Sequence, residues 1–185
     1  MQLTSFLPGA GEYALQAVQG LAGKARLHGL ILDLRSGGGG DPAEVSLLLS
    51  AFTHETAYAY DCDVHGNCSA TYTNTTVPLL HLPLVVLTDR NCAGACETFS
   101  GAVKDLRLGT LVGTRTAGVV AGPEQAYQLG DHSVLALPAA QQLGARHELI
   151  NGIGVAPGYY VPLTAQDLST GHDHDITKAL ALLGG

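Results

Sequence analysis

The sequence predicts an α/β fold in one domain, residues 1–185, and two features of its pattern lead to that prediction. Short apolar segments typical of buried parallel strands alternate with longer segments in which apolar residues recur at helical spacing. The connections between the strand-like segments are long enough for crossovers, as a parallel sheet covered by helices requires. No linker, internal repeat or low-complexity segment divides the chain, whose length suits one hydrophobic core.

The first half of the chain contains two expected helices around one strand. Apolar residues recur at helical spacing over residues 8–26, which predicts the first helix. Residues 29–34 are apolar enough to form a strand buried on both faces, and a loop of four glycines, residues 37–40, follows. Residues 41–44 then favour a helix start, with aspartate as N-cap, proline at the first position and glutamate at the third.

The second half alternates in the same way, beginning with an expected β-hairpin over residues 58–76. Strands are predicted at residues 83–88, 110–112, 126–129, 133–137 and 159–161. A helix is expected over residues 93–106, and a turn over residues 151–154. A closing helix over residues 175–183 is expected to bury Ile176, Leu180 and Leu183.

Composition and charge exclude several classes of function. A hydrophobic content of 46% is typical of a soluble globular protein, not of a disordered one. The formal net charge is −7 and no cluster of Lys and Arg occurs, so we expect no nucleic-acid partner. The longest apolar run, residues 77–87, is interrupted by prolines and too short for a membrane span. The first residues lack the basic and apolar regions of a signal peptide.

The four cysteines form two close pairs. Cys62 and Cys68 bracket a turn-rich stretch inside the expected hairpin, which favours a local disulfide in an extracytoplasmic or secreted protein; the alternative is two free cysteines in a cytosolic loop. Cys92 and Cys96 stand four residues apart at a helix start, where they pack, pair or, less plausibly without an adjacent histidine, act as thiol nucleophiles.

Two loops have the composition of an oxyanion site. In the glycine loop, backbone N–H groups can turn toward one point without obstruction by Cβ atoms, although glycines also simply permit a tight turn. Residues 91–97 lie between a buried strand and a helix N-terminus, where hydrolases expose a nucleophile; small residues there also pack well. Residues 172–175, His-Asp-His-Asp, have metal-ligand composition, but alternate residues at a helix start diverge, so we expect no metal or cofactor.

Three segments in order resemble the C-terminal-processing (tail-specific) serine peptidases, including the branch similar to the tricorn protease core. The family's first core motif is similar to residues 29–35 with the glycine loop. Its nucleophile segment is similar to residues 83–105 and 109–118 (GTLVGTRTAG). Its closing motif is similar to residues 151–157 (NGIGVAP). The resemblance implies a ClpP/crotonase-like α/β fold in which the hairpin is an insertion. It also implies acyl transfer on a peptide or protein substrate held in extended form.

The resemblance implies roles for individual residues. The family's nucleophile segment reads Ser-Ala-Ser-Ala-Ser-Glu with the middle serine attacking, whereas residues 92–97 read Cys-Ala-Gly-Ala-Cys-Glu, so Gly94 occupies the nucleophile slot. The N–H groups of Gly39 and Ala95 would form the oxyanion hole. In the lysine-using branch the base follows the serine by 25 residues, which is Val119 here, so a Ser–Lys dyad is excluded.

The other branch of the family uses a Ser-His-Ser-Glu tetrad. Its histidine precedes the first strand, and we expect that segment and the family's PDZ domain to be absent from this chain. Its glutamate falls near the closing motif, where Asn151 occupies the expected slot and Glu148 lies one turn away. The chain is then either a serine-type peptidase core in a mutated or truncated form, or a catalytically silent peptide-binding pseudoenzyme. A different reaction on the same scaffold is a third hypothesis.

Overall fold

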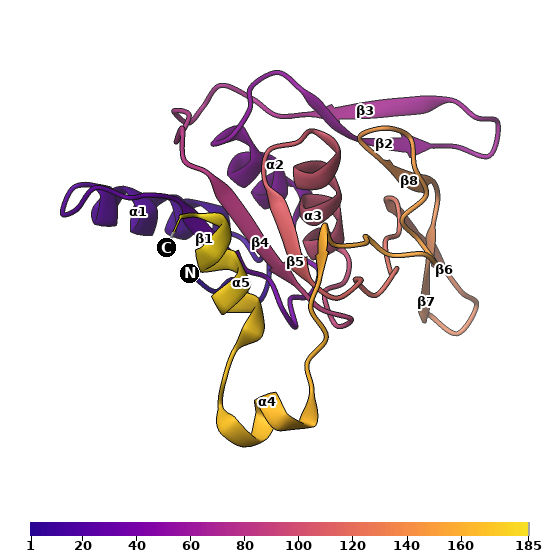
Figure 1. Cartoon of the computed structure of the whole chain (residues 1–185). Coiled ribbons are helices and arrows are strands. Elements are labelled where there is room, and N and C mark those ends of the chain that lie inside the picture. The colour runs from indigo at the N-terminus through magenta and orange to yellow at the C-terminus, as the bar shows by residue number, and fades with distance from the viewer. Residues whose placement is uncertain (185) are drawn as a thin grey trace.

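A computed structural model describes residues 1–184, in which helices cover both faces of a parallel sheet (Figure 1). The sheet has the order β1-β4-β5-β9, and its neighbouring strands all pair in parallel. Its strands are β1 (Leu30–Asp33), β4 (Leu84–Thr88), β5 (Thr110–Gly113) and β9 (Tyr159–Tyr160). The structure confirms the α/β class, and each of these four strands lies where the sequence predicts one, with bounds that differ by one residue at one or both ends.

Side-chain alternation along β4 divides the hydrophobic core into two parts. Leu84 and Val86 contact the larger core, which is formed with α1 (Ala10–Ala22), α2 (Pro42–Ser50) and α3 (Ala95–Asp105). Val85 and Leu87 contact the smaller core on the opposite face, under α5 (His174–Leu182). Successive strand residues point to opposite faces. All five residues of β4 are accordingly buried, as expected for a central parallel strand.

The start of α2 shows one expected contact and one unexpected one. Asp41 is the N-cap, and its side chain accepts a hydrogen bond from Ala43 N at 2.8 Å. Glu44 does not turn back to complete a capping box. Its carboxylate instead accepts hydrogen bonds from Gly9 N and Gly11 N, both at 2.8 Å, at the start of α1. An acidic group is favourable there because the first N–H groups of a helix have no partner within it.

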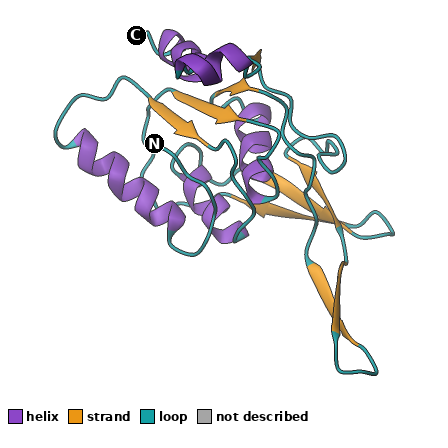
Figure 2. Cartoon of the chain, turned by 90° about the horizontal axis from the view of Figure 1, so that it is seen from below, coloured by secondary structure: helices purple, strands orange, loops and turns teal. Residues whose placement is uncertain are grey.

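The remaining strands form two antiparallel units. The expected hairpin is β2 (Ala57–Cys62) and β3 (Cys68–Tyr72), and β8 (Gln141–Gly144), which we did not predict, joins it in the order β3-β2-β8. Strands β6 (Glu124–Gln128) and β7 (Val134–Pro138) pair only with each other within the described chain. Figure 2 shows this second hairpin projecting from the body at the bottom of the view, and all its strand residues are exposed.

The closing helix differs from the expectation in the face that it buries. Ile176 and Leu180 were expected in the core, but they are 39% and 49% exposed. Ala179 is fully buried instead, and Leu182 packs beside it against β4 and β5. Leu183 packs there too, as predicted. The small side chain at 179 lets the helix axis approach the sheet, so the inner face is rotated from the predicted one. A further short helix, α4 (Ala165–Thr170), precedes α5. None of the described helices has the length and apolarity needed to cross a membrane.

Candidate functional site

The chain turns sharply between β4 and α3, and Gly94 is the N-cap residue of the helix. Gly94 has φ 60° and ψ −121°, a conformation that glycine adopts readily and residues with a Cβ adopt only with strain. Its carbonyl oxygen accepts hydrogen bonds from Glu97 N at 2.8 Å and Thr98 N at 3.0 Å, which begin the helix. A strained strand-to-helix turn is the backbone geometry in which hydrolases present a nucleophile. Position 94 has that geometry and no side chain.

The glycine loop after β1 lies directly against this turn. Ala93 N donates a hydrogen bond to Gly37 O at 2.9 Å, which joins the two loops. Phe6 N donates to Gly39 O at 3.2 Å and holds the loop from its other side. A Cβ atom at position 94 would lie 3.1 Å from Gly39 Cα. The two loops are therefore in van der Waals contact at the point where a nucleophile side chain would begin.

Two backbone N–H groups at this contact, those of Gly39 and Ala95, donate no hydrogen bond to any described residue. Ala95 is the first residue of α3, where N–H groups lack intrahelical acceptors and the helix dipole is positive. Both residues, together with Gly94, line a cavity of about 400 Å³. Two free donors at one cavity can stabilise the oxyanion that develops in acyl transfer. Gly39 and Ala95 therefore lie beside Gly94 at one cavity, and their role as oxyanion donors stays a prediction.

Val119 lines the same cavity, and its carbonyl oxygen accepts a hydrogen bond from Gly94 N at 2.9 Å. The segment that carries it is held by Glu97, whose fully buried carboxylate accepts hydrogen bonds from Gly118 N at 2.6 Å and Val119 N at 2.7 Å. The hydroxyl group of Thr116 donates to the same carboxylate. Glu97 therefore sets where position 119 lies relative to position 94. We had assigned it no role, although its place in the first turn of α3 is a signal that could have revealed one.

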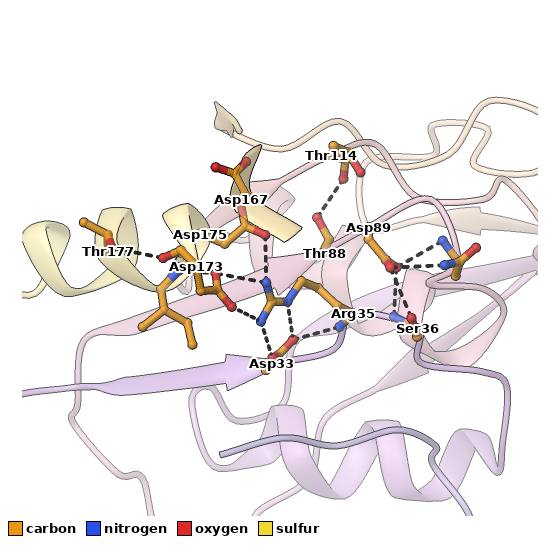
Figure 3. A network of polar contacts seen from close by, with 12 residues as sticks. Asp33, Arg35, Ser36, Thr88, Asp89, Thr114, Asp167, Asp173, Asp175 and Thr177 are labelled. Carbon is orange, nitrogen blue, oxygen red and sulfur yellow. Dashed lines mark hydrogen bonds and ion pairs between the residues drawn. The ribbon is translucent and has the colours of Figure 1, made fainter. Parts of the chain in front are cut away.

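Asp89, directly after β4, ties the two loops together from the outside (Figure 3). Its Oδ1 accepts hydrogen bonds from Ser36 N at 2.8 Å and Cys92 N at 3.0 Å, one from each loop. A single carboxylate thereby determines the spacing of the glycine loop and the turn at Gly94. Sequence reasoning missed Asp89, even though a polar residue at the carboxyl end of a buried parallel strand is a recognised place for a functional or positioning group.

A second polar cluster in Figure 3 contains the two aspartates of the His-Asp-His-Asp stretch, residues 172–175. Arg35 forms ion pairs with Asp33 at 2.7 Å, Asp173 at 2.8 Å and Asp175 at 3.1 Å, so α5 is attached to the end of β1. The hydrogen bond to Asp33 raises the pKa of Arg35 above its ordinary value. Within residues 1–184, no group of three or more His, Cys, Asp or Glu side chains is arranged to hold a metal ion. The two aspartates of this stretch hold an arginine.

The two residues expected near the closing motif do not line the cavity at Gly94. Asn151 Oδ1 accepts a hydrogen bond from Val120 N at 3.3 Å, and Asn151 lines a neighbouring cavity. Glu148 lies beside Asp105 at the C-terminal end of α3, and its Oε1 is buried without a hydrogen-bond partner in the described chain. Burial, together with the carboxyl group of Glu148, raises the pKa of Asp105 to about 7.

All four cysteines are in disulfides, Cys62 with Cys68 and Cys92 with Cys96. The second pair brackets Gly94 and is fully buried, so neither cysteine presents a thiol at the cavity.

The sequence profile of peptidase family S41 matches residues 1–161. The chain belongs to peptidase family S41. A C-terminal processing peptidase described as chloroplastic, from Tetradesmus obliquus, is 33% identical over 170 residues, covering 85% of this chain and 33% of that protein.

Solved structures of S41 peptidases share the fold. The photosystem II D1 C-terminal processing protease has a TM-score of 0.73 and 28% identity, covering 87% of this chain and 41% of that one. The tricorn protease has a TM-score of 0.71 and 25% identity, covering all of this chain and 17% of that one. The fold is therefore the ClpP/crotonase-like α/β fold. The chain spans about a third of the length of the algal S41 relative.

Proposed function

We propose that this chain is the core domain of a serine-type S41 peptidase that binds an extended peptide beside Gly94 and, as it stands, does not cleave it. One observation carries the proposal: Gly39 and Ala95, whose N–H groups donate no hydrogen bond within the described chain, line a cavity where position 94 supplies no nucleophile. These proposed oxyanion donors are backbone N–H groups, so they remain in place when the catalytic side chain is absent.

The absence of hydrolysis follows from the residues at the two catalytic positions. Gly94 has no hydroxyl group, and Val119, which lines the cavity at the position of the lysine in the Ser–Lys branch, cannot accept a proton. Without a nucleophile, a site of this kind retains only the acceleration that binding and the oxyanion donors supply, orders of magnitude below the intact site. The turn at Gly94 has the geometry of a nucleophile turn. This geometry supports two alternatives equally: a natural pseudoenzyme that descends from an active peptidase, or a mutated form of a peptidase that has serine at position 94.

The substrate class and location are proposed from the relatives and the disulfides. Relatives named as C-terminal processing peptidases and tricorn proteases act on polypeptides, which supports a peptide or protein partner for this chain. Two disulfides are typical of an oxidising compartment, which supports an extracytoplasmic or secreted location.

The test is a gain of function. The unaltered chain and the Gly94→Ser variant should show no labelling by a fluorophosphonate probe and no peptide hydrolysis. The Gly94→Ser/Val119→Lys double variant should become labelled, because it supplies a nucleophile and a base at two positions that line the cavity. Gly94→Ser/Val119→Met is the matched control, since methionine is similar in length and cannot take a proton. Hydrolysis by the unaltered chain would overturn the proposal, and so would failure of a folded double variant to react.

A further inference from the structure

The cavity at Gly94 has a one-sided charge. Of the residues that line it, only Asp61 and Glu124 carry charged side chains, and both are acidic. The rest of the lining is apolar or neutral and includes Val45, Tyr58 and Ala59. Tyr58 adds no charge at neutral pH, since tyrosine ordinarily has a pKa of about 10 and burial raises that of Tyr58 to about 12. A ligand side chain that enters this cavity therefore meets apolar walls and acidic groups, with no basic group in the lining to offset them.

Asp61 is held in place by a short chain of hydrogen bonds that begins at α3. Thr98, in the first turn of α3, donates from Oγ1 to Gln142 Oε1 at 2.7 Å. Gln142 Nε2 then donates to Asp61 Oδ1 at 3.4 Å. Asp61 and Gln142 are direct partners in the pairing of β2 with β8. This bond to Oδ1 is the one hydrogen bond that the carboxylate accepts from described residues, so Oδ2 remains available to a ligand.

We infer that the cavity selects a lysine or arginine side chain, from the peptide residue whose carbonyl oxygen lies at the N–H groups of Gly39 and Ala95. The aliphatic part of such a side chain would pack against the apolar residues of the lining, and its cationic end would reach Asp61. The combination of an apolar stem and a charged end suits this lining, because long basic side chains bury their methylene groups and leave the head at a polar group. The inference rests on the proposed peptide binding and adds the class of residue recognised.

The test measures peptide binding by fluorescence polarisation. Fluorescein-labelled peptides of the form Ala-Ala-Xaa-Ala-Ala-amide are compared, with arginine, norleucine or glutamate at Xaa. The arginine peptide should bind about tenfold more tightly than the norleucine peptide, the size of one charge-assisted hydrogen bond, and the glutamate peptide most weakly. The Asp61→Asn variant keeps the shape and the contact with Gln142, so it should bind norleucine as before and lose the preference for arginine.

The controls separate this inference from the proposal beneath it. Glu12→Gln, on the exposed side of α1, changes the net charge equally and should keep the arginine preference. Absence of binding by every peptide would overturn the proposed function itself. Binding without preference for arginine in the unaltered chain would overturn only the selection of a basic residue. A preference that is lost in Glu124→Gln but kept in Asp61→Asn would overturn the assignment to Asp61.

Discussion

Replacing Gly94 by serine puts a side chain where the glycine loop meets the turn before α3, and the structure sets the stability cost of that change. The backbone at Gly94 has φ 60° and ψ −121°, which costs a residue with a Cβ about 1–3 kcal/mol. The new Cβ would also lie 3.1 Å from Gly39 Cα, so the glycine loop must shift by a few tenths of an ångström. We therefore expect the free energy of unfolding to fall by about 1–3 kcal/mol.

Thermal unfolding followed by circular dichroism measures this cost. For a chain of this length, the expected loss lowers the melting temperature by about 3–10 °C. Gly130→Ser is the matched control, because position 130 has a φ outside the left-handed region and nothing within 4 Å of an added Cβ. That control should shift the melting temperature by no more than about 2 °C. If Gly94→Ser melts at the same temperature as the unaltered chain, the backbone at position 94 does not have the strained geometry on which the site assignment depends.

Three further predictions concern groups around the site. Glu97→Gln should lower the free energy of unfolding by about 2–3 kcal/mol in urea titration, because the amide NH₂ group would face backbone N–H donors. The exposed control Glu12→Gln should change it by less than about 0.5 kcal/mol. Equal effects would contradict the buried hydrogen bonds to Glu97. The pKa of Asp105 is raised in the folded state, so the folded protein binds the proton of this carboxyl group more tightly than the unfolded chain. The resulting contribution to the free energy of unfolding is present at low pH and is lost as pH rises through about 7. Asp105→Asn should therefore raise the melting temperature at pH 8 more than at pH 5, and a pH-independent effect would argue against the raised pKa. Non-reducing peptide mapping should find Cys62 joined to Cys68, a link worth about 2 kcal/mol, and free thiols after oxidative refolding would exclude it.

The sequence predicts those parts of the fold that local pattern determines. The run of residues 84–87 is apolar throughout, and a strand with two buried faces is its simplest interpretation. Asp41 before Pro42 specifies a helix start by local hydrogen bonding, and the structure has that cap. The expected positions of Gly39, Gly94 and Ala95 relative to one another depend on three motifs in a known order, not on periodicity. Their roles in binding stay predictions.

What the sequence does not reveal depends on contacts between distant segments. The segment 141–144 has no alternation of its own, and it becomes β8 because β2 offers it an edge. Glu44 looks like part of a capping box, yet α1 brings two N–H groups nearer to it. Asp61 has no distinguishing neighbours in the sequence, since its place at the cavity comes from pairing with Gln142. Long-range pairing of this kind has no local signature.

The hairpin of β6 and β7 has a consequence for any ligand that enters the cavity. Its strands have no third partner within the described chain, and a two-stranded hairpin exposed on both faces is marginally stable in water. It should therefore open at a lower free energy than the four-stranded sheet, and its amide hydrogens should exchange sooner. Residues 121–123, at its base, line the cavity. A bound peptide would restrict that base, so part of the binding energy would be spent on conformational entropy, and exchange would slow along the hairpin at amides that the peptide never touches.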